Sequence, residues 1–428
     1  MKEVISPKEF DLEVESLSDD EQPLPDGGFG WVVVGASFMV SFIVYGLIYT
    51  YNFVYEHYME QEEYQTYRVQ LELVGTVNLA VLNFSCLVMG RVDDRLGHRR
   101  CIMIGASIYT LGLVISAFVE SAWLLILTQG VMLGLGGSMA SIATISAPMQ
   151  WFDKRRGLAS GIAMAGCGLG GLFLALVVPE VLKKISIRDF LLIFAAFSFV
   201  TMMAAALVIR DQPKSESMDD IPWYDCTIMK NPMFLLLLLG NTIATFGYIV
   251  PSYKMLKYVE ALGLTKSHNS YILSMVCLAA SISRVIGGAM ADKLGACNML
   301  ILSLITMFLS CSIVWVLSKT LVTLLIFGFL FGFGMGGFVS LPPMITSKLF
   351  GLKGLSTTNG WLYFTAGIPS LCGVYIATAI IDSTPPSPTD VTGTSFYAIQ
   401  YAGATALVGA VFIFWLKLMN NRNPFAKI

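Results

Sequence analysis

The octapeptide GRVDDRLG, residues 90–97, returns as GAMADKLG at residues 288–295, 198 positions further along a chain of 428 residues. Both copies read Gly, three residues, Asp, a basic residue, Leu and Gly. A polar segment that occurs once in each half of a chain predicts two equivalent halves. The repeated positions are Gly90, Asp94, Arg95 and Gly97 in the first copy, and Gly288, Asp292, Lys293 and Gly295 in the second.

The composition indicates a membrane protein. Apolar residues make up 55% and charged residues 13%, and the mean hydropathy is +0.70, whereas soluble domains carry about 25% charged residues. A net charge of −2 without a basic run gives no sign of a nucleic-acid partner. The eight cysteines form no CxxC pair and lie mostly in apolar segments, so we read them as packing residues, and we expect no metal site and no cofactor. They are residues 86, 101, 167, 226, 277, 297, 311 and 372.

Apolar stretches of about 20 residues recur along the whole chain, and each is long enough to cross a bilayer. Spans of this length must be helices, because lipid leaves no backbone group unpaired and a strand crosses in about 10 residues. The sequence therefore predicts an all-α integral membrane protein with twelve transmembrane helices. The predicted spans are 30–54, 68–90, 101–120, 122–149, 157–182, 189–209, 232–257, 270–291, 297–317, 320–346, 355–381 and 395–417.

The most polar long break in this pattern divides the spans six and six. We expect an N-terminal tail (1–29), a first six-helix half (30–209), a linker (210–231), a second half (232–417) and a C-terminal tail (418–428). With both termini inside, the inner segments carry 18 Lys and Arg residues and the outer loops seven. Both tails and the linker are therefore predicted to be cytoplasmic. We expect the plasma membrane as the location.

Each octapeptide lies at the cytoplasmic end of the second helix of its half. Its glycines allow close approach and a tight reversal of the chain. Its Asp can face the N-terminus of a neighbouring helix, and its basic residue stays on the positive side of the membrane. We interpret the pair as structural latches rather than catalytic groups. The first copy continues as HRR (98–100), and the repeat resembles the signature loop of the major facilitator superfamily, which implies that fold with two halves related by a pseudo-twofold axis.

Two further stretches narrow the resemblance. PDGGFGWVVV (25–34) opens the first span with a turn followed by aromatic residues at the depth of an interfacial belt. WFDKRRGLASGIAMAGCGLGG (151–171) places basic residues before a run of small residues that permits tight helix packing. Together they resemble the two signatures of the monocarboxylate transporters. The positions that carry this resemblance are Asp26, Gly27, Gly28, Trp31, Arg155 and Arg156.

One charge lies deep in a predicted span. Arg284 stands about 14 residues into the eighth span, where an arginine costs about 2.5–3.5 kcal/mol on insertion scales and usually lines a cavity or pairs. No Asp or Glu lies at that depth in any span, so a substrate carboxylate is the partner we expect. The resemblance agrees, since the family's arginine at this position contacts the substrate anion. The alternative is an arginine satisfied by helix carbonyls and water, while Lys254, near an outer end, is a weaker candidate for a gate.

Other candidate site residues depart from the family pattern. Resemblance implies a titrating Asp at Ala280, a Lys at Tyr49 and an Asp at Lys348, so the usual proton relay is missing and we expect weak or no classical proton coupling. Tyr45 matches a cavity position of the family, and Tyr45, Tyr49 and Asn52 form a stripe along the first span. Tyr248 can face the same cavity. Ordinary helix packing explains these four residues equally well.

The sequence thus predicts a secondary transporter, resembling the monocarboxylate transporters, for a small organic acid or related carboxylate-bearing solute. A proton as co-substrate, and hence symport, stays open, as does a single-span accessory glycoprotein as partner. The alternatives are a facilitator for an amino acid, amine or hormone-like solute, and a receptor or scaffold that does not transport. An enzyme is not expected, because no span carries the clustered residues that catalysis requires.

Overall fold

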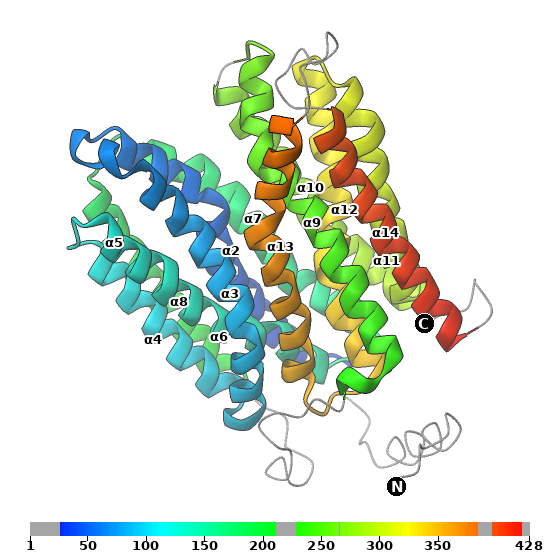
Figure 1. Ribbon diagram of the computed structural model, residues 1–428. Helices are drawn as coiled ribbons and strands as arrows, with labels where there is room; N and C mark the ends of the chain where they lie inside the picture. Colours follow the sequence, from blue (N-terminus) through cyan, green and yellow to red (C-terminus); the bar gives the residue numbers. More distant parts are fainter. Residues whose placement is uncertain (1–25, 211–227, 265, 384–395, 422–428) are drawn as a thin grey trace, which may run out of the picture.

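The computed structural model describes residues 26–210, 228–264, 266–383 and 396–421. Within these ranges the chain is helical, and twelve helices are long and apolar enough to cross a membrane (Figure 1). The prediction of an all-α protein with twelve spans is confirmed. The spans comprise α2 (Gly30–Met59), α3 (Arg68–Leu96), α4 (His98–Ser116), α5 to η3 (Ala122–Gln150), α7 (Arg156–Leu182), α8 (Ile187–Val208), α9 (Pro232–Ala261), α10 (Lys266–Leu294), α11 with η6 (Ala296–Trp315), α12 (Leu321–Leu349), α13 (Leu355–Ser383) and α14 (Phe396–Asn420).

Two spans contain π-helical turns. The fourth is built from α5 (Ala122–Leu125), η2 (Ile126–Met132), α6 (Leu133–Ser146) and the 3-10 turn η3 (Ala147–Gln150), and the ninth joins α11 (Ala296–Leu309) to η6 (Ser310–Trp315). Short 3-10 turns also precede α3 (η1, Glu62–Tyr67) and α9 (η5, Ile228–Lys230). Each π segment shifts the register of its helix without breaking the span.

The octapeptides are more helical than the sequence predicted. We expected the second span to end at residue 90 and the eighth at 291, but α3 runs to Leu96 and α10 to Leu294. The chain breaks only at Gly97 and Gly295, whose φ angles of 88° and 97° are open to glycine and strained for other residues. The polar residues of the octapeptide thus sit on helix turns, which fixes their direction.

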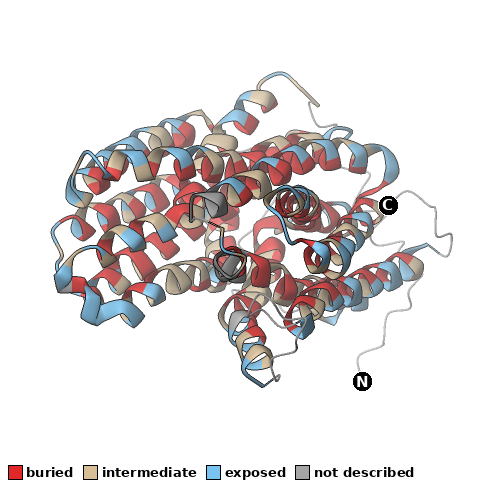
Figure 2. Ribbon diagram, turned by 90° about the horizontal axis from the view of Figure 1, so that it is seen from above, coloured by how far each residue is buried: buried red, intermediate tan, exposed pale blue. Residues whose placement is uncertain are grey.

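The helices form two bundles (Figure 1). The first contains α2 to α8 and the second α9 to α14, and each has its own large cluster of buried apolar side chains. Viewed along the bundles, buried residues face inward and exposed residues face the periphery (Figure 2). Many peripheral residues are large and apolar, such as Trp123, Val200 and Leu317, with exposed fractions of 64%, 66% and 69%. Such an apolar periphery is expected for a protein that is surrounded by the lipid bilayer rather than by water.

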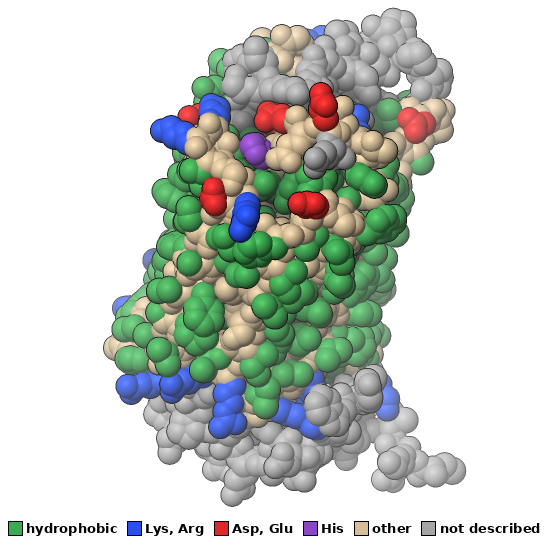
Figure 3. All heavy atoms as spheres, turned by 90° about the vertical axis from the view of Figure 1, so that its left-hand side faces the viewer, with side chains coloured by type: hydrophobic (Ala, Val, Ile, Leu, Met, Phe, Trp, Pro, Cys, Tyr) green, Lys and Arg blue, Asp and Glu red, His purple; other side chains and the backbone are tan. Residues whose placement is uncertain are grey.

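Charged side chains flank the apolar surface at both ends (Figure 3). On the face shown, acidic side chains, a histidine and basic side chains lie above the apolar band, and basic side chains lie below it. We call the lower end, which holds residues 90–97 and 288–295, the latch end. The upper end is called the opposite end.

The halves meet chiefly where α7 contacts α10 and where α3 contacts α13. Glycines bring these backbones together. A Cβ atom built on Gly161 of α7 would lie 2.1 Å from the carbonyl oxygen of Arg284, and one on Gly288 of α10 would lie 2.1 Å from that of Gly157. Gly90 of α3 meets the carbonyl of Ser356 in the same way, at 2.2 Å. Side chains are excluded from these contacts, so the helices touch backbone to backbone.

Of the described cysteines, six are buried and Cys372 is exposed, and all are free thiols. The burial of these six agrees with the prediction that the cysteines are packing residues, whereas the exposed Cys372 does not fit that prediction. Cys226 lies outside the described residues. So do most of the predicted linker and most of each predicted tail.

We predict that Gly161→Ala destabilises the protein by about 1–3 kcal/mol, the usual cost of overpacking a close contact. The matched control is Gly35→Ala in α2, since a Cβ there meets nothing within 4 Å. Thermal unfolding of both variants in detergent measures the difference. Equal unfolding midpoints would show that α7 and α10 do not depend on this contact.

Candidate functional site

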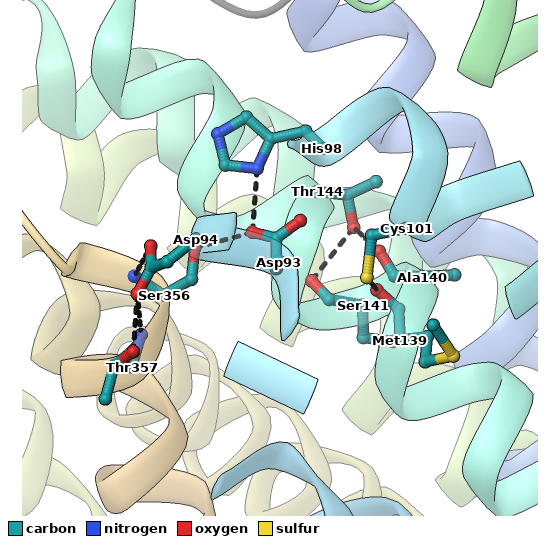
Figure 4. A network of polar contacts seen from close by, with 10 residues as sticks. All are labelled: Asp93, Asp94, His98, Cys101, Met139, Ala140, Ser141, Thr144, Ser356 and Thr357. Carbon is teal, nitrogen blue, oxygen red and sulfur yellow. Dashed lines mark hydrogen bonds and ion pairs between the residues drawn. The ribbon is translucent and has the colours of Figure 1, made fainter. Parts of the chain in front are cut away.

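The first latch joins α3 to α13. Asp94, near the end of α3, accepts hydrogen bonds from the backbone N–H of Ser356 (3.2 Å) and Thr357 (2.8 Å), and Thr357 also donates its hydroxyl (Figure 4). Because α13 begins at Leu355, these N–H groups belong to its first turn and have no acceptor within the helix. Asp94 therefore caps a helix that belongs to the other half.

The second latch joins α10 to α7. Asp292 accepts from the backbone N–H of Gly157 (2.8 Å) and of Leu158 (2.9 Å), in the first turn of α7. The direction is the reverse of the first latch, because here the second half caps a helix of the first. The two octapeptides thus make equivalent contacts in opposite senses, as a pseudo-twofold axis requires.

Each latch gains from charge as well as from hydrogen bonds. A helix N-terminus carries a positive partial charge, and a carboxylate placed there contributes about 0.3–1 kcal/mol, or up to about 2 kcal/mol when partly buried. Asp94 is 9% exposed, and Asp292 is partly buried. Since both contacts cross between halves, this free energy stabilises closure of the latch end.

The turn before α2 docks onto the loop before α7. The Asp26 carboxylate accepts from the backbone N–H of Asp153 (2.8 Å) and Lys154 (2.9 Å). Asp26 and Gly28 both have positive φ angles, of 47° and 57°, and glycine adopts this conformation at position 28 without strain. The two stretches that carried the family resemblance are therefore one structural unit.

Trp31 does not act purely as a membrane anchor. We expected Phe29 and Trp31 in an interfacial belt, yet Trp31 packs against the ring of Phe152 at 4.8 Å and Phe29 against Trp151 at 5.5 Å. A Cβ on Gly30 would lie 2.9 Å from the Phe152 ring. The aromatic residues serve to hold α2 against the start of α7.

The basic latch-end residues differ in their placement. Arg156 is 7% exposed and reaches from α7 to the carbonyl of Ser347 on α12 at 3.3 Å, so it makes another contact between the halves. Arg155 and Lys293 are exposed, and Arg95 is partly buried.

Arg284 lies at the centre of the α7–α10 contact. Its side chain is fully buried, one guanidinium nitrogen donates to the carbonyl of Met164 on α7 at 3.1 Å, and its Nε–H has no hydrogen-bond partner. It stands eight residues before Asp292, or about 12 Å along α10. The Met164 carbonyl thus accepts from one N–H of the guanidinium, while the Nε–H has no acceptor.

Tyrosines from both halves surround this guanidinium. The Tyr49 hydroxyl on α2 interacts with Arg284. Tyr45, one turn earlier, interacts with Tyr363 on α13, which in turn interacts with Arg284. The Tyr363 hydroxyl is buried without a hydrogen-bond partner. Sequence reasoning missed Tyr363, because the eleventh span offered no charge or motif to single it out.

The other predicted site residues lie further from this centre or on its edge. Asn52 is exposed. Tyr248 is half-buried, packs against the ring of Phe338 at 5.8 Å and interacts with Tyr363. Lys348 is exposed at the end of α12, and the side chain of Lys254 lies outside the described residues.

Ala280, the position at which resemblance implies an acid, is packed against α12. It is 2% exposed, and a Cβ on Gly336 would lie 2.3 Å from its carbonyl oxygen and 2.8 Å from its Cα. Within the described spans, no carboxylate therefore accompanies Arg284 on this part of α10.

Comparison with known proteins supports a transporter. The family model of the Major Facilitator Superfamily matches residues 37–258 and 232–427. Monocarboxylate transporter 13 of Rattus norvegicus is 24% identical over 90% of this chain and 88% of its own length. Probable transporter MCH2 of Saccharomyces cerevisiae is 28% identical over 92% of this chain and 83% of its own. Among solved structures, the human organic anion transporter MFSD10 (TETRAN) aligns with a TM-score of 0.65 and 12% identity, covering 89% of this chain and 98% of that one.

We predict that Asp94→Asn and Asp292→Asn each loosen the latch end. Asn keeps an acceptor oxygen but loses the charge, which removes about 1 kcal/mol and changes the closed-to-open ratio about fivefold. The distance between spin labels on cysteines placed at the exposed Leu96 and Leu294, in a Cys372→Ser background of the purified protein, measures the ratio. Asp189→Asn, in the first turn of α8 at the opposite end, should have no effect. Loss of substrate binding in a folded latch variant would contradict a purely structural role.

Proposed function

Because this chain belongs to the major facilitator superfamily, we propose that it moves a small organic acid or related carboxylate-bearing solute across the membrane by alternating access. Its similarity to named monocarboxylate transporters over nearly the whole chain confirms the family resemblance found in the sequence. The protein is thus a secondary transporter similar to the monocarboxylate transporters and not an enzyme. The substrate class, the coupling and the membrane are the proposed part.

One observation carries the substrate class: a fully buried arginine with an unsatisfied N–H, between the two halves. Burying a charge is costly unless it is paired, and the Met164 carbonyl carries only a partial charge. A substrate carboxylate supplies a full negative charge and two acceptor oxygens, which fit the guanidinium fork. Two relatives are named monocarboxylate transporters, which supports the same class.

The neighbouring tyrosines suit the remainder of such a solute. Tyr49 hydrogen-bonds to Arg284 and Tyr363 interacts with it electrostatically, so both can offer a hydroxyl group and an apolar ring to a bound solute. A buried hydroxyl without a partner costs about 1–3 kcal/mol, so a ligand oxygen that accepts from Tyr363 would gain affinity. We propose Arg284, Tyr49 and Tyr363 as the core of the substrate site, with Tyr45 and Tyr248 beside it.

Weak or absent proton coupling is proposed on the same residues. Tyr49 and Ala280 stand where the family has titrating groups, and the Ala280 backbone is in close contact with Gly336. A tyrosine retains its proton at neutral pH. Acid uptake should therefore follow the substrate gradient and respond weakly to an imposed pH gradient.

Removal of the guanidinium tests the proposal. Arg284→Lys keeps the charge but loses the fork, and should weaken carboxylate binding by roughly 1.5–3 kcal/mol, about one to two orders of magnitude. Arg284→Ala should abolish acid uptake into proteoliposomes, and Tyr363→Phe should reduce it less. The matched control is Arg188→Lys, an exposed arginine at the start of α8. Undiminished acid flux in Arg284→Ala, or preference for amines in a parallel uptake screen, would refute the site.

The orientation and the plasma membrane location are likewise proposed. The Lys and Arg residues along the latch end (Figure 3) favour that end as cytoplasmic. We expect epitope tags on both termini to be inaccessible to antibody in intact cells and accessible after permeabilisation. Labelling of either tag on intact cells would reverse the orientation.

A further inference from the structure

A second carboxylate lies beside the first latch. Asp93, the neighbour of Asp94, is fully buried, and one of its oxygens accepts from the Ser356 hydroxyl at 2.6 Å and lies 2.8 Å from Nδ1 of His98. The His98 side chain is 5% exposed. Figure 4 shows Asp93 between His98 on one side and Ser356 on the other. Asp93 therefore links an imidazole of the first half to the start of α13 in the second half.

The charge on Asp93 is poorly compensated by hydrogen bonds. Both described contacts fall on the same oxygen, and the other oxygen has no hydrogen-bond partner among the described residues. Asp94 adds a second negative charge next to it. A buried carboxylate in such a place is costly unless a cation is paired with it, and a protonated His98 is that cation.

Other charged groups lie on the same helices as the pair. On α3 they are Asp94, Arg91 and Arg95, and on α4 they are the exposed Arg99 and Arg100. Helix α6 has no Asp, Glu, Lys, Arg or His between Leu133 and Ser146, and Lys353, before α13, is exposed. Beyond α8, Arg210 lies over the Phe29 ring at 4.7 Å. Histidine is the side chain whose ordinary pKa, about 6.5, falls in the physiological range.

We propose that the Asp93–His98 pair is a proton-binding site of the latch end, and that protonation of His98 stabilises the closed latch. This site acts on the conformational equilibrium whatever the transported solute is. It also differs from classical coupling, because the proton binds at the end of the protein and not beside the substrate.

The sign follows from linkage. In the closed form Ser356 holds the Asp93 carboxylate beside His98 with water excluded, so an imidazolium there is strongly stabilised. Separation of α3 from α13 removes Ser356 and admits water, which weakens the ion pair. The closed form thus binds the proton more tightly, and by reciprocity the proton favours the closed form. The stabilisation is present at low pH and is lost as pH rises.

Two exposed and equivalent positions report on closure. Leu96 at the end of α3 and Leu294 at the end of α10 are 39% and 50% exposed and carry no charge. With spin labels on cysteines at these sites in the full chain, the distance distribution should shift from long to short as pH falls from about 8 to about 5.5. A proton affinity that differs by half to one pK unit between the states changes the ratio about three- to tenfold.

Variants separate this pair from other titrations. His98→Asn places an amide N–H near the position of Nδ1 and does not titrate, so the distance ratio should no longer depend on pH. His57→Asn is the matched control, because His57 lies 3.6 Å from Glu60 at the opposite end and should leave the pH response intact. Three outcomes would overturn the proposal. In the protein that keeps its native histidines, these are a label distance that does not change with pH and one that changes in the opposite direction. In His98→Asn, it is a label distance that still changes with pH. The first two outcomes need no His98 variant to fold.

Discussion

A carboxylate of one half on a helix N-terminus of the other is the contact on which the closed latch end depends. The first-turn N–H groups of α7 and α13 have no acceptors in their own helices, and Asp292 and Asp94 supply them from across the interface. A helix end near the membrane surface would otherwise rely on water. Each half therefore completes a helix of its partner, which contributes to closure.

The glycines make that contact geometrically possible. Gly90 and Gly288 let the backbones of α3 and α10 approach Ser356 and Gly157 closely enough for the next polar turn to reach the helix ends. At these glycine contacts no side chains interdigitate, although Phe84 of α3 packs on Phe364 of α13 further along the helices. Such an interface can separate as a unit, which suits helices that must part and meet again during alternating access.

The sequence was sufficient for the fold because lipid restricts the choices. Twelve apolar stretches could only be helices, and the repeated octapeptide identified two halves before any contact was known. The partner of each Asp was out of reach, since spacing along the chain says nothing about which helix end lies nearby. The same limit hid Tyr363 and the Asp93–His98 pair, although the histidine that directly follows the first octapeptide was visible in the sequence. The packing of Trp31 on Phe152 could not be predicted either, because an aromatic residue at a span end has the same pattern whether it faces lipid or another ring.

The proposed substrate site and the second latch share the same pair of helices. Arg284 and Asp292 both belong to α10, and both contact α7, one at the Met164 carbonyl and the other at the first-turn N–H groups. A carboxylate that draws the guanidinium away from Met164 changes the α7–α10 contact about 12 Å from the latch. Binding and closure are then coupled through one interface, and the coupling must be reciprocal. A latch that is too strong would hold the arginine on its carbonyl, so the modest free energy of a helix cap suits a contact that has to break in every transport cycle.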